Sequence, residues 1–159
     1  MTRRTAWFVH VSSALVAGTG LVYGWMAYFA TPADEFAVVG HPFQPTFQHL
    51  HVLAAPFVVF ACGLAWRSHV WGRIRSGFRQ RRRTGITLAV LLLPMIASGY
   101  LLQVTTDEAL RTAWVWTHVA TSCAWTVVYV AHQVLRRSPP GAAEPGAADG
   151  PDRPPPQSP

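Results

Sequence analysis

Two histidines, His118 and His132, lie 14 positions apart in the mostly apolar stretch WTHVATSCAWTVVYVAHQV, residues 116–134. Fourteen residues make about four turns of an α-helix, so both rings would project from nearly the same face, about 21 Å apart along the axis. At that separation the two rings cannot ligate one metal ion. Each can serve a separate centre, one near either side of a membrane.

Histidine is costly in a membrane helix. A charged side chain there costs roughly 2.5 kcal/mol or more, and a neutral imidazole is still polar. The chain nevertheless contains seven histidines. We therefore expect some of them to have a binding task. They are His10, His41, His49, His51, His69, His118 and His132.

Four apolar stretches of the chain qualify as membrane spans, each of which needs about 20 residues as a helix. Half of the residues are hydrophobic and only 13% are charged, a balance unlike that of soluble globular proteins. We predict an all-α fold, an integral membrane four-helix bundle formed by residues 1–137. The spans are Ala6–Ala30, which we expect to be retained rather than cleaved as a signal peptide, Thr46–Trp66, Gly85–Val104 and Thr112–Leu135.

The basic residues are all arginines, and their positions predict the topology. Arginines precede the first span, fill residues 67–83 and follow the fourth span, whereas the other two connections contain TPADEF and TTDEALR. By the positive-inside rule both termini and the middle loop are cytoplasmic. The net charge of +6 then reflects topology, so we expect a lipid bilayer and not nucleic acid as partner. Residues 138–159, rich in Pro, Ala and Gly, are expected to form a disordered cytoplasmic tail.

Depth along the spans pairs His10 with His132. His132 lies four residues before Arg136, and His10 lies six residues after Arg4. Both histidines therefore lie near the cytoplasmic surface, on different helices. We predict that they form an inner pair.

His118 needs a partner near the outer surface. His49 in the second span matches its depth best, and His51 is the alternative. Residues two apart on a helix point in very different directions, so only one of them would face His118. Helix tilt and a kink at Pro56 could shift the balance between them. The outer pair is thus His118 with His49 or His51.

Two pairs of imidazoles suit haem better than other metal centres. Zinc takes three or four protein ligands and a di-iron centre takes carboxylates, but the four spans contain no Asp or Glu. Haem supplies four ligands from its porphyrin and takes one or two from the protein. We therefore expect two haems of b type, since no CxxCH motif for covalent attachment is present. A centre with both axial positions filled transfers electrons.

Three glycines and one arginine lie where a haem could contact them. Gly24 and Gly99 are near the outer level and Gly63 is near the inner level. They could leave room for a macrocycle, or they could allow close helix contact, as small residues commonly do in membranes. Arg67 at the cytoplasmic surface could bind a haem propionate by charge-assisted hydrogen bonds, although topology alone also explains it.

These residues resemble the bacterial four-helix dihaem cytochrome b superfamily, which includes bacterial cytochrome b561 and the membrane subunits of formate dehydrogenase and nickel-iron hydrogenase. Its fourth helix carries two haem ligands 14 residues apart, matched here by His118 and His132. Its first and second helices supply one ligand each, matched by His10 and by His49 or His51. The resemblance covers about residues 5–135, and the two histidines that begin the second helix depart from the simplest pattern.

The resemblance implies a protein of the bacterial inner membrane that carries electrons between quinone or quinol and a periplasmic or membrane-associated redox protein. It would be an electron-transfer subunit rather than a complete enzyme. One alternative is a self-contained quinol oxidoreductase of the cytochrome b561 type; another is an ion transporter or metal-binding membrane protein. A quinone site could lie at the cytoplasmic surface near Trp66, Arg67, His69 and Trp71, which otherwise are interfacial anchors.

Overall fold

Every regular element among the described residues is a helix. The computed structural model describes residues 1–32, 34–75 and 82–134, and the predicted tail lies outside these residues. The prediction of an all-α fold is confirmed for the described part. The elements are α1 (Arg3–Tyr28), α2 (Gln44–Ala65), the π-helical turn η1 (Trp66–Val70), α3 (Trp71–Arg75), α4 (Arg82–Val104) and α5 (Glu108–Val134).

Local signals explain where these helices begin. The side chain of Thr2 caps α1 by accepting a hydrogen bond from the backbone N–H of Thr5 at 3.2 Å. Asp107 does the same before α5, where its carboxylate accepts from the N–H of Leu110 at 2.8 Å. Glu108 adds a negative charge in the first turn of α5, which the helix dipole favours. α2 has a proline in its first turn, where the missing N–H costs no hydrogen bond.

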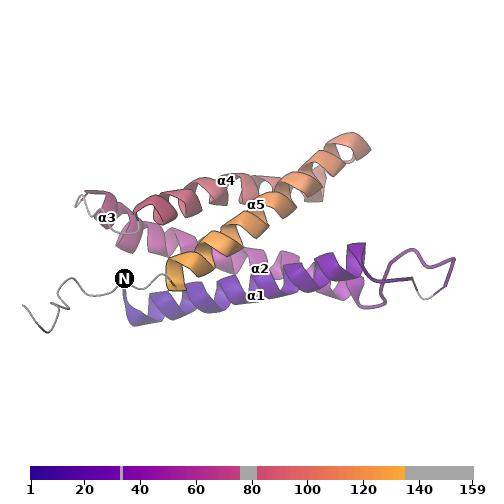
Figure 1. The fold of residues 1–159 in the computed structure, drawn as a ribbon, viewed down its shortest axis with the longest axis horizontal. Coiled ribbons are helices and arrows are strands. Elements are labelled where there is room, and N and C mark those ends of the chain that lie inside the picture. Colours follow the sequence, from indigo (N-terminus) through magenta and orange to yellow (C-terminus); the bar gives the residue numbers. More distant parts are fainter. Residues whose placement is uncertain (33, 76–81, 135–159) are drawn as a thin grey trace, which may run out of the picture.

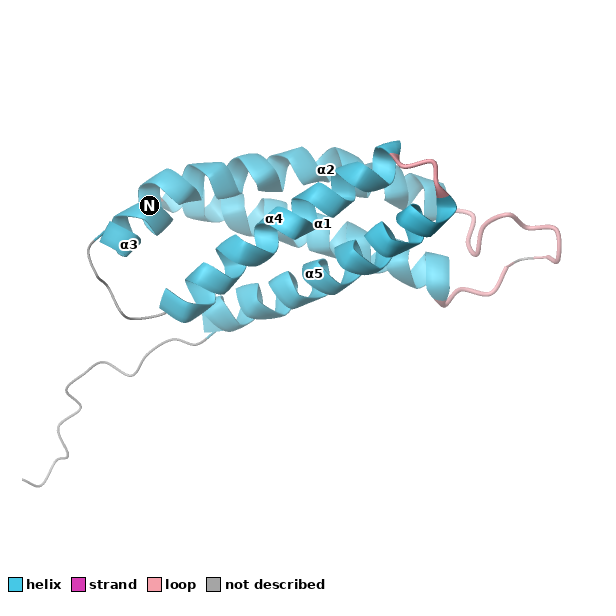
Figure 2. Ribbon diagram, turned by 90° about the horizontal axis from the view of Figure 1, so that it is seen from above, coloured by secondary structure: helices cyan, strands magenta, loops and turns pink. Residues whose placement is uncertain are grey.

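The four long helices form two antiparallel hairpins. α1 packs along α2, α4 packs along α5, and the two hairpins approach each other at far fewer points (Figure 1). Both views place the N-terminus, α3 and the last turn of α5 at one end of the molecule. The α1–α2 loop and the α4–α5 connection lie at the other end (Figure 2). His10 near the start of α1 and His132 in the last turn of α5 therefore lie at the same end of the molecule.

Three of the helices are long and apolar enough to cross a membrane: Arg3–Tyr28, Gln44–Ala65 and Arg83–Val104. This supports the prediction of a membrane protein. α5 is of similar length, with 27 residues, but its threonines and two histidines make it less apolar than the other three. It is therefore the most polar of the four long helices, and it carries His118 and His132.

Charged residues separate between the two ends of the bundle. One end carries only arginines among its described charges, and we call it the arginine-rich end. The other end, here called the acidic end, carries four carboxylates and one arginine. The residues are Arg3, Arg4, Arg67, Arg75 and Arg83 at the first end, and Asp34, Glu35, Asp107, Glu108 and Arg111 at the second.

The interior of the bundle consists mainly of small side chains. Ala61 of α2 is fully buried, whereas Leu93 and Val127 face outward with 73% and 68% of their surface exposed. Small residues let helix backbones approach closely, and outward apolar side chains suit contact with lipid. The other small buried residues are Ser12, Ser13, Ala54 and Ser98.

We expect Ala61→Leu to destabilise the α1–α2 hairpin by about 1–3 kcal/mol, because the larger side chain must push apart helices that touch at a fully buried position. Ala120→Leu is the control, since Ala120 is exposed on α5. Thermal unfolding in detergent measures the difference. Equal unfolding midpoints for the two variants would show that position 61 is not closely packed.

Candidate paired-histidine site

Two histidine rings from different hairpins face each other in the half of the bundle nearer the acidic end. The ring centroids of His51 on α2 and His118 on α5 lie 6.1 Å apart, and the ring planes are inclined by 76°. Both residues are half-buried. The pair thus joins two hairpins that otherwise make few contacts with each other.

A backbone carbonyl of α1 holds the ring of His51. Its Nδ1 lies 3.1 Å from the carbonyl oxygen of Val16 and 3.3 Å from Oγ1 of Thr19. A carbonyl oxygen can only accept a hydrogen bond, so Nδ1 carries the proton. The lone pair of the neutral ring is then on Nε2, the nitrogen that remains available to a ligand.

α4 holds the ring of His118 in the same way. Nδ1 of His118 lies 3.0 Å from the carbonyl oxygen of Met95 and 3.3 Å from Oγ of Ser98. The carbonyl again requires the proton to be on Nδ1 and leaves the lone pair on Nε2. The two rings of the pair therefore share one tautomer.

A glycine completes each of these contacts. A Cβ atom on Gly20 would lie 2.8 Å from Cε1 of His51, and one on Gly99 would lie 3.0 Å from Cε1 of His118. A side chain at Gly20 would force the ring of His51 to shift, and one at Gly99 would force the ring of His118 to give by a few tenths of an ångström. The same spacing occurs on both helices: a carbonyl, a hydroxyl three residues later and a glycine at the fourth. We call this the carbonyl–hydroxyl–glycine motif, formed by Val16, Thr19 and Gly20 on α1 and by Met95, Ser98 and Gly99 on α4.

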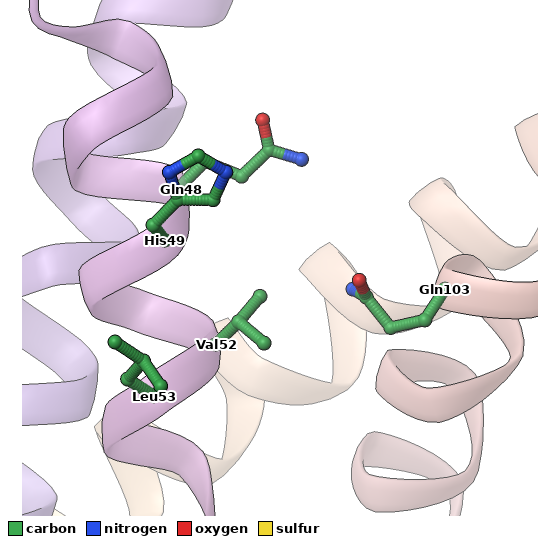
Figure 3. Close-up of a pocket in the computed structure, with 5 residues that line it drawn as sticks. All are labelled: Gln48, His49, Val52, Leu53 and Gln103. Atoms are coloured by element: carbon green, nitrogen blue, oxygen red, sulfur yellow. The ribbon is translucent and has the colours of Figure 1, made fainter.

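His49, the partner that depth favoured for His118, lies elsewhere. It is exposed and lines a cavity of about 310 Å³ between α2 and α4, together with Gln48, Val52, Leu53 and Gln103 (Figure 3). Of the two alternatives left open by the sequence, the structure places His51 against His118. The difference is one of orientation and not of depth, since two residues turn the side chain by about 200° around the helix.

At the arginine-rich end, His10 of α1 contacts α5. Its Nδ1 forms a hydrogen bond with the hydroxyl of Tyr129, and the two ring centroids are 6.1 Å apart. Tyr129 lies one turn before His132, whose own Nδ1 lies 2.8 Å from Oγ1 of Thr84 on α4. His10 and His132 are therefore at the same end of the bundle. The Nδ1 atoms of His10 and His132 each contact a hydroxyl, whereas those of His51 and His118 contact a backbone carbonyl as well as a hydroxyl.

An aromatic stack lies between the levels of the two pairs. Trp125 is only 7% exposed and stacks on Tyr129, with centroids 5.0 Å apart and planes 9° apart. Trp125 is seven residues from both His118 and His132. The stack borders a cavity of about 210 Å³ between α1 and α5, which is lined by His10, Ser13, Ala14, Ala17, Trp125, Thr126, Tyr129 and Val130.

The other residues predicted to lie beside a haem or a quinone face open space or are exposed. A Cβ atom on Gly24 or Gly63 would meet nothing within 4 Å, so there is open space beside both glycines. Arg67 is exposed in η1. Trp66 and Trp71 are each 47% exposed near it, as residues at a membrane interface would be.

The site offers paired ligands and not a larger cluster. Within residues 1–32, 34–75 and 82–134, no three His, Cys, Asp or Glu side chains come together to hold a metal ion. Zinc in proteins takes at least three protein ligands, so this arrangement does not suit it. Two imidazoles suit a group that brings most of its own ligands.

Comparisons of the chain with protein-family models, with curated proteins and with solved structures find no match.

We expect Gly20→Ala to displace the ring of His51 and break its hydrogen bond to Val16, at a cost of about 1 kcal/mol. Gly18→Ala is the control, because a Cβ atom at Gly18 meets nothing within 4 Å. The ¹⁵N NMR shifts of the ring nitrogens report the tautomer of His51, and thermal unfolding in detergent reports the stability. An unchanged Nδ1–H signal in Gly20→Ala would contradict the close approach of ring and backbone.

Proposed function

We propose that this protein is a membrane cytochrome b of the four-helix dihaem type, which carries electrons across the bacterial inner membrane through two bis-histidine b haems. The observation that supports this best is the His51–His118 pair. Its two imidazoles come from separate hairpins, share one tautomer and lie 6.1 Å apart. His51, rather than His49, is then the partner of His118.

The spacing of this pair fits an iron porphyrin. Two metal–nitrogen bonds of about 2.0 Å, plus the distance from each nitrogen to the centre of its ring, put two axial imidazoles roughly 6 Å apart between centroids. The observed 6.1 Å agrees with this value. The carbonyls of Val16 and Met95 also play the usual part of outer hydrogen-bond acceptors, which fix the orientation of a metal-binding histidine and make it more basic.

His10 and His132 are the proposed ligands of the second haem. They lie at the same end of the bundle, on α1 and α5, with the hydroxyls of Tyr129 and Thr84 at their Nδ1 atoms. The cavity beside His10 adds space at this level. Gly63 on α2 faces open space that a macrocycle at this level could use, whereas the open space beside Gly24 on α1 lies nearer the acidic end.

The protein binds, orients and shields the two groups. Haem supplies a one-electron iron couple, and the chain's own residues set its surroundings. Apolar helices exclude water from both centres, and filled axial positions keep oxygen and other small ligands away from iron. Trp125 fills the space between the two levels and holds Tyr129 against His10.

In this proposal α5 is the fourth span. Its 27 residues are long enough to cross a bilayer, and its polar side chains include the two haem ligands. The arginine-rich end faces the cytoplasm, and the acidic end faces the periplasm. Both chain termini are then cytoplasmic.

The proposed partners are quinone or quinol within the bilayer and a redox protein at the periplasmic face or in the membrane. The described connections at the acidic end are short, comprising residues 29–43 and 105–107. They leave no room there for a second catalytic domain. We therefore propose an electron-transfer subunit of a larger oxidoreductase rather than a complete enzyme.

We expect the purified protein to show the reduced-minus-oxidised spectrum of haem b, with about two haems per chain. His118→Ala and His51→Ala should each remove one haem, because each change deletes one of the two protein ligands of that centre. His49→Ala is the matched control and should retain both haems. Pyridine haemochrome assays measure the haem content of each variant.

Loss of a haem in His49→Ala but not in His51→Ala would reverse the assignment of the ligand on α2. A wild-type protein that binds no haem when expressed with an adequate haem supply would refute the function itself.

The second pair makes a separate prediction. His10→Ala and His132→Ala should each remove one haem, and the haem that stays should be the one missing from His118→Ala. Potentiometric titration followed in the visible spectrum distinguishes the two centres. If His10→Ala and His118→Ala removed the same centre, the assignment of separate pairs would be wrong.

A further inference from the structure

We infer that the hydroxyls of Thr19 and Ser98 are a matched pair of positioning groups, which fix the planes of the His51 and His118 rings and lower the reduction potential of the centre they hold. This inference rests on the proposed function. Neither hydroxyl would touch the iron or its porphyrin in this role. Each acts through the histidine that it contacts.

The hydrogen-bond geometry shows how each hydroxyl faces its histidine. Oγ1 of Thr19 donates its hydrogen to the carbonyl of Leu15 at 2.8 Å, and Oγ of Ser98 donates to the carbonyl of Pro94 at 2.6 Å. Each oxygen therefore presents a lone pair to the Nδ1–H group that lies 3.3 Å away. Each Nδ1–H has two acceptors on the neighbouring helix, a carbonyl and a hydroxyl.

Two acceptors constrain a ring more than one does. With the carbonyl alone, the imidazole can rotate about a single hydrogen bond. The hydroxyl oxygen adds a second acceptor, 3.2 Å from the carbonyl oxygen on α1 and 3.1 Å from it on α4, and restricts that rotation. The glycine of each motif brings the ring against the backbone and limits it further. Together these contacts define the 76° angle between the two ring planes.

The same contacts have an electronic consequence. A hydrogen bond donated from Nδ1–H shifts electron density into the ring and makes Nε2 a stronger ligand. A stronger axial ligand stabilises the oxidised iron more than the reduced iron, so it lowers the potential. Hydrogen bonding around the centre is one of the means by which a protein sets haem potential. Removing either hydroxyl should therefore raise it.

The arrangement is more than the usual bonding of a serine or threonine to its own helix. Ser12 on α1 is also buried and donates to the carbonyls of Phe8 at 2.7 Å and Val9 at 3.2 Å. None of its hydrogen bonds involves a histidine ring. Contact with a histidine distinguishes Thr19 and Ser98 from Ser12, and on both hairpins it occurs at the same spacing from a carbonyl and a glycine.

The experiment compares hydroxyl-free and hydroxyl-retaining variants of the full-length, haem-loaded protein. Thr19→Val and Ser98→Ala remove the hydroxyl, Thr19→Ser and Ser98→Thr keep it, and Ser12→Ala is the matched control. Redox titration gives the midpoint potential of each haem. The centre in question is the one that His118→Ala removes.

We expect a positive shift of that midpoint in Thr19→Val and in Ser98→Ala, and a larger shift when the two are combined. The other haem should keep its potential.

Nearly perpendicular axial ligands make two iron d orbitals almost equal in energy, so the electron paramagnetic resonance spectrum of the ferric centre should show a strongly anisotropic g tensor. That anisotropy should change in the hydroxyl-free variants. Thr19→Ser, Ser98→Thr and Ser12→Ala should resemble the wild type in both measurements.

Haem loss at this centre that is confined to the hydroxyl-free variants would also support the inference. Full haem content with wild-type potential and spectrum in Thr19→Val and Ser98→Ala would overturn it and leave the proposed function intact. Equal effects of the hydroxyl-free and hydroxyl-retaining variants would overturn it too, because side-chain shape and not the hydroxyl would then be responsible. Absence of haem from the wild type would instead refute the proposed function.

Discussion

A hydrogen bond from a histidine ring to a backbone carbonyl of the neighbouring helix is the interaction on which this structure depends. It is made once in each hairpin, by His51 on Val16 and by His118 on Met95. A backbone carbonyl in a helix already accepts a hydrogen bond from the N–H group four residues later. A histidine ring can approach the same carbonyl more closely where that later residue is a glycine, which has no side chain in the way. The glycines meet this condition, and the small buried residues along α1, α2 and α4 keep the helices close enough for the contact.

The two levels of the bundle differ in how they hold their histidines. Towards the acidic end, obligate acceptors determine which ring nitrogen carries the proton. Towards the arginine-rich end, the hydroxyls of Tyr129 and Thr84 can both donate and accept, so they leave that choice to whatever else contacts His10 and His132. In the proposed cytochrome, this difference adds to the opposite charges of the two ends in making the two centres electrically unlike.

Much of the fold followed from the sequence, because apolar length and arginine placement depend on composition along one dimension. The helices α1, α2, α4 and α5 lie close to the predicted spans, with His10 near the start of α1 and His132 in the last turn of α5. Depth could not choose between His49 and His51, because that choice depends on the rotation of α2 about its axis and on the position of Gly20 across the interface. A hydroxyl residue followed by glycine marks both contacts, as TG at 19–20 and SG at 98–99, but the same pairs also occur at 76–77 and 84–85, so the pair alone does not identify them.

Each hairpin orders its own imidazole without help from the other hairpin, since donor, acceptors and glycine all belong to one pair of adjacent helices. The entropy of fixing each ring is therefore lost when a hairpin forms, before the two halves meet. In the proposed cytochrome, association of the two hairpins around a haem would then need little further ordering, which favours tight binding. Each hairpin thus provides one preordered half of the paired-histidine site.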